Sequence, residues 1–349
     1  MSDSLPTPTD CDSGRKRSSA LELGPRKKSC VQDPLVHHGR HFGRTIHAFC
    51  NVQTLLCNGI IFFGDLADGK SEEELTATER RELKVFRELL KQIPHFESRI
   101  LESSEEEVII MADLHQIQKG ANGARSDDTK GIKGTVIDWI TPKGQALSPP
   151  IARNSKTGRG FHHERTGALL CPAGLDWSNN DIKEKLRVGQ YELQEINGRL
   201  FSTMVSDTTQ KIHGMGYLEA AKFVFTSPSS VDQEPKATRS GNARIHGMRA
   251  MTKASIAYIA TQVRFSLTSA AVFSRTDLVT DSERFYNSIV DLLEDPEEKD
   301  EVDSLLTWWN RQLFSAYAEP ERPSNTNTAL AKIRAKRMAL KAAAGLAPP

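Results

Sequence analysis

The stretch FGRTIHAFCNVQTLLCNGIIFF, residues 42–63, has the strongest apolar pattern in the chain. At steps of three and four residues it places on one helical face Phe42, Ile46, Phe49, Gln53, Leu56, Ile60 and Phe63. Only Gln53 breaks the apolar series. The pattern predicts one amphipathic helix over this stretch, packed at the centre of the fold.

Further helix signals follow along the chain. Thr76 and Glu79 form a capping box before an apolar stripe that Pro94 ends. Thr252 stands where an N-cap precedes another stripe, and Asp281 or Ser282 does so before the next one. We predict the remaining helices at residues 103–119, 128–140, 179–187, 217–225 and 297–314. No strand or internal repeat is recognised, which indicates an all-α fold with a single multi-helix domain.

Composition divides the chain into three parts. Residues 1–36 are rich in Ser, Pro and charge and lack an apolar period, so we expect a disordered basic tail. Residues 37–318 form the predicted helical domain. Residues 319–349 read as a basic, low-complexity tail in which Ala329–Ala344 favours helix. Net charge is +3 over residues 1–50, −7 over 51–320 and +5 over 321–349.

The sequence also indicates a cellular location. The longest purely apolar run has four residues, Ile60–Phe63, far short of the ~20 that a membrane helix needs. Met1–Asp12 has no signal-peptide pattern, and five scattered cysteines without a C-x-x-C pair argue against a disulfide framework. We therefore expect a nuclear or cytoplasmic protein, with the nucleus favoured. The nuclear-import candidates are two basic triplets, Arg15, Lys16, Arg17 and Arg26, Lys27, Lys28.

Two Gly-, Ser- and Pro-containing loops carry most of the candidate binding residues. Residues 141–165 hold five Lys or Arg against one Glu, and residues 236–253 hold five against none. Cations beside free backbone N–H groups suit phosphate contact. The anion- or nucleic-acid-binding candidates are Lys143, Arg153, Lys156, Arg159, Arg165, Arg239, Arg244 and Arg249. Alternatively, these cations pair with residues 281–303, which hold ten Asp or Glu against two Lys or Arg.

The histidines raise three further possibilities: metal binding, general base catalysis and recombinase-like catalysis. His37 and His41 have the i, i+4 spacing of metal ligands, but no closed ligand set accompanies them, so we expect no metal. His162 and His163 lie among arginines, as a general base near bound phosphate would. His246-x-x-Arg249 with Tyr286 matches part of the tyrosine recombinase set, but His-x-x-Arg occurs four times here and is unspecific.

Several motifs together resemble a known family. They begin with GRHFGRTIHAFCNVQTLL from Gly39 and FHHERTGALLCPAG from Phe161. They continue with FTSPSSV from Phe225, KATRSGNARIHGM from Lys236 and LLTWWNRQ from Leu305. Over roughly residues 38–315 the chain is similar to an uncharacterised domain family abundant in mushroom-forming fungi. The resemblance implies no catalytic residue. Its large copy number implies an interaction role or an association with mobile elements.

These observations favour a non-enzymatic nuclear interaction module, DNA- or chromatin-associated through its basic loops, with no cofactor. The alternative is an enzyme acting on a phosphate-containing substrate by phosphoryl transfer or recombinase-like chemistry. No phosphate-binding, zinc-protease or hydrolase motif supports the alternative. The arrangement of the two basic loops discriminates between them. Convergence in one concave pocket favours an enzyme, and separation favours the interaction module.

Overall fold

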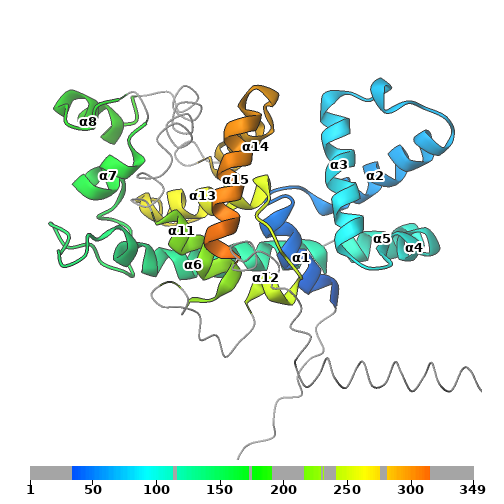
Figure 1. The fold of residues 1–349 in the computed structure, drawn as a ribbon, viewed down its shortest axis with the longest axis horizontal. Coiled ribbons are helices and arrows are strands. Elements are labelled where there is room, and N and C mark those ends of the chain that lie inside the picture. Colours follow the sequence, from blue (N-terminus) through cyan, green and yellow to red (C-terminus); the bar gives the residue numbers. More distant parts are fainter. Residues whose placement is uncertain are drawn as a thin grey trace, which may run out of the picture. The chain divides into compact units, whose positions relative to one another are not determined.

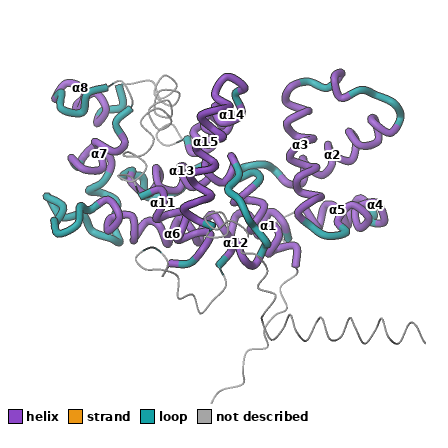
Figure 2. The backbone as a smooth tube through the Cα atoms, viewed as in Figure 1, coloured by secondary structure: helices purple, strands orange, loops and turns teal. Residues whose placement is uncertain are grey.

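The computed structural model describes residues 34–112, 116–172, 175–190, 216–228, 231, 241–275 and 281–314. They belong to one unit of the chain, Asp33–Pro349, while Met1–Gln32 form a separate unit that lies outside the described residues. All regular elements in these described ranges are helices (Figure 2). The all-α prediction is therefore confirmed. Among the described helices, none combines the length and the apolar character required to cross a membrane.

Figure 1 labels the helices in chain order. The α-helices are α1 Pro34–Thr45, α2 Val52–Ala67, α3 Ala77–Gln92, α4 Phe96–Glu102, α5 Glu105–Ala112, α6 Ile117–Ile140, α7 Glu164–Leu170, α8 Asn180–Arg187, α11 Tyr217–Ala221, α12 Asn242–Ile245, α13 Lys253–Leu267, α14 Ser282–Glu294 and α15 Lys299–Leu313. The shorter turns are η1 Glu72–Glu74, η2 Gly160–His162, the π-helical turn η3 Lys222–Thr226 and η5 Pro296–Glu298.

The predicted N-caps are confirmed. The Thr76 hydroxyl accepts from the Glu79 N–H, and the Glu79 carboxylate accepts from the Thr76 N–H. Thr252 forms a second capping box at the start of α13, and Asp281 accepts from the Arg284 N–H at the start of α14. These side chains satisfy backbone donors that a helix leaves free, so they fix where these helices begin.

The single helix predicted over residues 42–63 is wrong, because the stretch forms two helices. The Asn51 side chain accepts from the N–H groups of Gln53 and Thr54, which makes Asn51 the N-cap of α2. Asn competes with the helical backbone in this way and favours a helix start over a helix interior. The apolar period continues through the break, which is why it suggested one helix.

Helix α6 is longer than predicted, with 24 residues. The helix expected over 103–119 instead stops, as α5, at Ala112. Glycines at the start of α6 obscured its pattern. A Cβ on Gly120 would lie 2.2 Å from the Val36 carbonyl oxygen, and one on Gly39 would lie 2.1 Å from that of Ile117. Glycine is therefore needed where the backbones of α1 and α6 touch.

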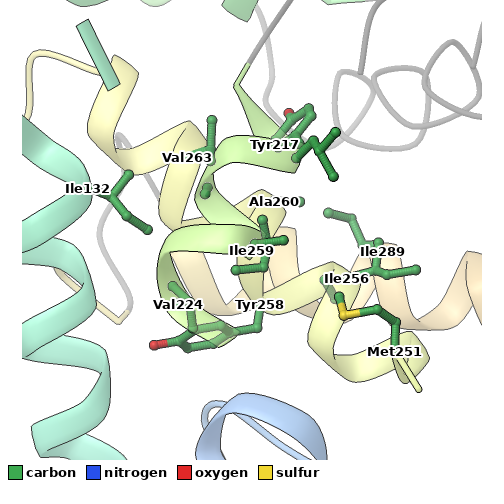
Figure 3. Packing of buried hydrophobic residues seen from close by; sticks show 14 of the residues in the cluster. Ile132, Tyr217, Val224, Met251, Ile256, Tyr258, Ile259, Ala260, Val263 and Ile289 are labelled. Carbon is green, nitrogen blue, oxygen red and sulfur yellow. The ribbon is translucent and has the colours of Figure 1, made fainter. Parts of the chain in front are cut away.

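Helix α13 is the most buried element, because every residue from Ser255 to Leu267 is buried. Figure 3 shows its apolar side chains meeting Ile132 of α6, Val224 of η3 and Ile289 of α14. The surrounding cluster, here called the second core, joins α6, α7 and α11 to α15. We had expected the central helix within residues 42–63, and that expectation is corrected in favour of α13.

A further cluster, here called the first core, is formed by α1 to α5 and the beginning of α6. Ile117 of α6 lies in the first core and Ile132 in the second, so α6 runs through both. The cores are also connected at the surface, where Lys84 of α3 pairs with Glu294 of α14 at 2.6 Å. Because α6 contributes to both cores, the packing of each core helps to position the α6 residues that contact α1.

Candidate functional site

A buried ion pair with a tyrosine joins α1, α6 and α13. The Arg44 Nε and Nη2 atoms donate to the Asp128 carboxylate at 2.7 and 2.8 Å, and the Tyr258 hydroxyl donates to it at 2.6 Å. Arg44 is 3% exposed and Asp128 is 5% exposed. Bidentate Arg–carboxylate bonds are geometrically demanding. The ion pair therefore fixes the rotation of α1 about its own axis against α6. That rotation determines the direction in which the histidines of α1 point.

Two histidine rings stack where α1 meets the end of α12. The ring centroids of His41 and His246 lie 4.4 Å apart, with 5° between the planes, and His38 approaches edge-on at 6.3 Å. Burial, followed by His246 and Arg44, lowers the pKa of His41 to about 3. Burial and then the charges of His38 and Arg44 lower the pKa of His246 to about 4. Both rings are therefore neutral at neutral pH.

Close backbone contacts hold α12 in this position. The Asn242 side chain donates to the Val224 carbonyl of η3. A Cβ on Gly241 would lie 1.7 Å from a backbone oxygen of η3, so only glycine fits there. The Thr252 hydroxyl donates to the Thr45 carbonyl of α1 at 2.6 Å. The segment is thus attached at both ends, and His246 is presented to α1.

The basic patch is defined as the cationic and imidazole side chains of the two segments that meet at this stack, α1 and residues 244–249: His37, His38, Arg40, His41, Arg44, Arg244, His246 and Arg249. Arg40 pairs with Asp127 at 2.7 Å. Arg244 and Arg249 are exposed, and within the described ranges no carboxylate pairs with either. Among the residues that the structure describes, His38 Nδ1 and Arg44 Nη1 are buried and have no hydrogen-bond partner. The patch carries more positive than negative charge and can attract an anion.

Two cations of the first basic loop point into the protein. The Lys156 ammonium donates to the Phe265 carbonyl and lies 3.2 Å from the centre of the Phe265 ring. Burial lowers the pKa of Lys156 to about 7. Arg159 is fully buried and donates to four carbonyls, those of Lys133, Ala152, Arg153 and Ser266. Both side chains thereby satisfy carbonyls at the C-terminal end of α13, where positive charge is favoured.

The other predicted residues of this loop have different surroundings. The Arg165 Nε donates to the Ile140 carbonyl at the end of α6. Arg153 is exposed and pairs with Asp138 at 2.7 Å. Lys143 is exposed in the turn after α6. His163 is buried, with its ring nitrogens bonded to the Pro149 carbonyl and the Arg165 N–H. Only Lys143 and Arg153 remain on the surface in a form that a large ligand can reach.

The two sets of predicted cations do not converge. Lys156 and Arg159 bind the C-terminal end of α13, while the segment with Arg244 and Arg249 leads into its N-terminal end. A helix of 15 residues is about 22 Å long. In the parts of the two basic loops that the structure describes, Lys156 and Arg159 therefore do not share one concave pocket with Arg244 and Arg249.

The acidic segment 281–303, which we considered as a partner for the basic loops, pairs instead with cations of α3. Asp291 and Glu294 of α14 pair with Arg81 and Lys84 of α3, and Arg153 pairs with Asp138. None of the ion pairs seen in the described ranges joins a cation of the basic loops to α14 or α15. The predicted contact residue Arg239 and both N-terminal triplets lie outside the described residues.

Of the four N-terminal histidines, only His47 lies outside the basic patch. His47 lies apart from the stacked pair, with its ring 5.4 Å from that of Tyr286. Tyr286 is buried at 1% exposure within the second core. In the parts of the chain that the structure describes, no three His, Cys, Asp or Glu side chains are grouped to hold a metal ion.

Sequence reasoning missed Asp128 and Tyr258. Arg44 lies 84 residues from Asp128, and Tyr258 lies 130 residues from it, so no local motif joins them. One signal was present. Asp128 continues the buried series Ile117, Ala121, Ala124 and Ile132 of α6 at helical spacing. A carboxylate on an apolar helical face predicts a buried cationic partner, although not which one.

In the described ranges, the fold is all-helical and carries one basic patch. The model of a family of unknown function (DUF6698) matches residues 119–314, and the chain belongs to this family. The match includes the motifs from Phe161 onward but not the motif from Gly39, so it is shorter than the resemblance that we predicted. No curated protein and no solved structure matches the chain.

Proposed function

We propose that this chain is a non-enzymatic interaction module that binds the phosphate backbone of double-stranded DNA without reading its sequence. The observation that carries the proposal is the basic patch, in which Arg244 and Arg249 are exposed and have no carboxylate partner among the described residues. Arg40 adds a third cation, which is half-exposed and paired with Asp127. Besides burial, its charge contributes to lowering the pKa of His246. Exposed cations of this kind neutralise phosphates and release counterions.

The form of the patch supports sequence-independent contact. Arg244 lies on α12, a helix of four residues, and Arg249 lies in the loop after it. Reading base edges in the major groove usually requires a helix long enough to lie in the groove with several side chains aimed at the bases. Two arginines on a short helix and a loop can hold phosphates, but they do not form such a row.

The surroundings of the first loop argue against the phosphoryl-transfer alternative. Of its two candidate bases, His162 is exposed and His163 is buried. His163 and the candidate phosphate ligands Lys156 and Arg159 are bonded to backbone groups. A general base needs hydrogen-bond access to its substrate. We therefore favour the interaction module and propose no catalytic residue.

Binding of random-sequence duplex DNA to the full chain tests the proposal. Three phosphate contacts give a log–log salt slope of about −2.7. We expect the double change Arg244→Ala and Arg249→Ala to reduce that slope by about 2. A matched control is Arg80→Ala with Arg99→Ala, which removes two exposed arginines from α3 and α4 and is expected to leave binding unchanged.

Three results would overturn the proposal. The first is no binding at low salt. The second is equal binding by the two double variants. The third is strong preference for one duplex sequence, because that requires contacts to base edges rather than to phosphates alone.

We further propose that the chain acts in the nucleus. Two basic triplets spaced eight residues apart, Arg15–Arg17 and Arg26–Lys28, support this. Replacing both triplets with alanine is expected to shift a tagged full chain from the nucleus to the cytoplasm. Unchanged nuclear fluorescence would exclude the triplets as the import signal.

A further inference from the structure

The turn of residues 241–249, here called the α12 turn, exposes a large apolar side chain, that of Ile245, which is 60% exposed. On the inner side of the same turn, Ala243 is buried in the second core and Met248 packs against that core. Single exposed apolar residues are common on protein surfaces. The surroundings of Ile245 therefore decide whether its exposure has a function.

These surroundings are cationic. Arg244 precedes Ile245 and Arg249 follows it on the same turn, and both arginines are exposed. Four other large apolar side chains are exposed in the described ranges: Ile61, Leu101, Val188 and Val272. Each of these has a carboxylate within four residues or, at Val272, a neighbouring arginine that pairs with Glu283. Among the five, Ile245 is the one that lies beside two arginines and has no carboxylate nearby in sequence.

Backbone hydrogen bonds make the α12 turn rigid. The Met248 N–H donates to the Ala243 carbonyl at 2.7 Å, and the Gly247 N–H donates to that of Arg244 at 3.3 Å. Gly247 has a φ of 66°, so these two bonds form a Schellman cap, which ends α12 in one defined conformation. The stacked histidines and the Asn242 bond to η3 hold this cap against the rest of the fold. Ile245 is thus presented to solvent on a fixed base.

We propose that Ile245 enters the minor groove of duplex DNA, inserts between two adjacent base pairs and bends the duplex, while Arg244 and Arg249 hold nearby phosphates. This inference rests on the duplex binding proposed above. Proteins that bend DNA without reading its sequence use apolar side chains in this way. The minor groove is about 6 Å wide, so it admits a single side chain on a tight turn but not a whole helix.

The chemistry of the α12 turn favours a base step over an apolar protein surface as the occupant. A purely apolar partner would remove Arg244 and Arg249 from water without offering them an anion, which is unfavourable. Duplex DNA offers phosphates to the arginines and apolar base faces to Ile245. Unstacking a base step costs free energy, and burial of an exposed apolar side chain offsets part of that cost. A rigid turn also loses little conformational freedom on insertion.

Bending of a duplex labelled at both ends, measured by fluorescence energy transfer in complex with the full chain, tests the proposal. We expect the native chain to bend the duplex by at least about 20°. Ile245→Ala removes the inserted side chain but no phosphate contact. We therefore expect this variant to bind with an unchanged salt slope and to leave the duplex straight.

Two further variants serve as controls. Ile245→Leu keeps an apolar side chain of similar size and is expected to keep the bend. Leu101→Ala shortens another strongly exposed apolar side chain, on α4, outside the basic patch. We expect Leu101→Ala to leave both the bend and the affinity unchanged.

A single mismatch at the centre of the duplex gives a second measurement, because a mismatched base costs less to unstack. We expect the mismatch to strengthen binding by the native chain about tenfold and binding by Ile245→Ala hardly at all. A native complex with straight DNA, or a bend that Ile245→Ala retains, would overturn the insertion and leave phosphate binding intact. No binding at low salt would overturn both the insertion and the proposed function.

Discussion

Acidification from pH 7 to pH 5 is expected to destabilise the fold through His41. The unfolded histidine has a pKa of 6.5, and the folded one has a pKa of about 3. Between these values the unfolded state binds more protons, so stability is lost as the pH falls below 6.5. For a single group with these two pKa values, the loss between pH 7 and pH 5 is about 2 kcal/mol.

Two other histidines act in the same direction. The pKa of His47 is lowered to about 4, mainly by burial, and that of His246 to about 4. His246 is less buried than His41, so solvent screening reduces its contribution to about 1 kcal/mol. Carboxylates whose pKa is lowered, such as Glu79 and Asp303, contribute little above pH 5, because their unfolded pKa values are 4.5 and 3.8.

Urea unfolding of the full chain, followed by circular dichroism at the two pH values, measures this loss. His41→Phe keeps a planar ring beside His246 and removes the titrating nitrogens. We expect its pH-dependent loss to be smaller than that of the native chain by about 2 kcal/mol. His162→Gln changes an exposed histidine and serves as the control. The reasoning fails if the native chain is equally stable at both pH values, or if His41→Phe retains the full loss.

The remaining predictions concern backbone contact and helix ends. Gly120→Ala is expected to destabilise the fold by about 3 kcal/mol, because its Cβ would enter the α1 backbone. Gly134 lies on the same helix with open space around it, so Gly134→Ala is expected to stabilise the fold by about 0.5–1 kcal/mol. Equal shifts of the melting temperature for the two variants would contradict a close contact at Gly120. Arg159→Lys should lower the free energy of unfolding by about 3 kcal/mol, because one ammonium cannot bond four carbonyls. Arg153→Lys, at the surface, should change it by less than about 0.5 kcal/mol in the same denaturation assay, and similar losses for both would refute the capping role.

Helix starts were the most predictable feature, because an N-cap and the backbone groups that it bonds lie within three residues. Thr76 and Thr252 could be identified from local sequence alone, and the start of α14 could be narrowed to Asp281 or Ser282, of which the structure has Asp281 as the cap. The beginning of α6 could not, because Gly120 lowers helix propensity and its benefit comes from α1, about 80 residues earlier. The break before Asn51 was hidden for the opposite reason, since the apolar period continues across it.

The candidate site was less predictable than the fold. Composition located two segments rich in cations, but not the short helix α12 within the second of them, nor the direction of each side chain. Arg159 and Arg249 have the same charge and similar Gly- and Ser-containing neighbours, yet one is fully buried and the other exposed. What distinguishes them is the position of unsatisfied carbonyls at the end of α13. That position is set by tertiary packing, which local sequence does not contain.

The Arg44–Asp128 ion pair also determines which piece of this chain can be produced on its own. A fragment cut at the family boundary, residues 119–314, keeps Asp128 and Tyr258 but loses Arg44. Its buried carboxylate would have no counterion, and the glycine face of α6 would be open to water. The extent of sequence similarity and the extent of an autonomous folding unit therefore differ here. Expression of a shortened protein should begin before Pro34, so that α1 is synthesised together with the helices it completes.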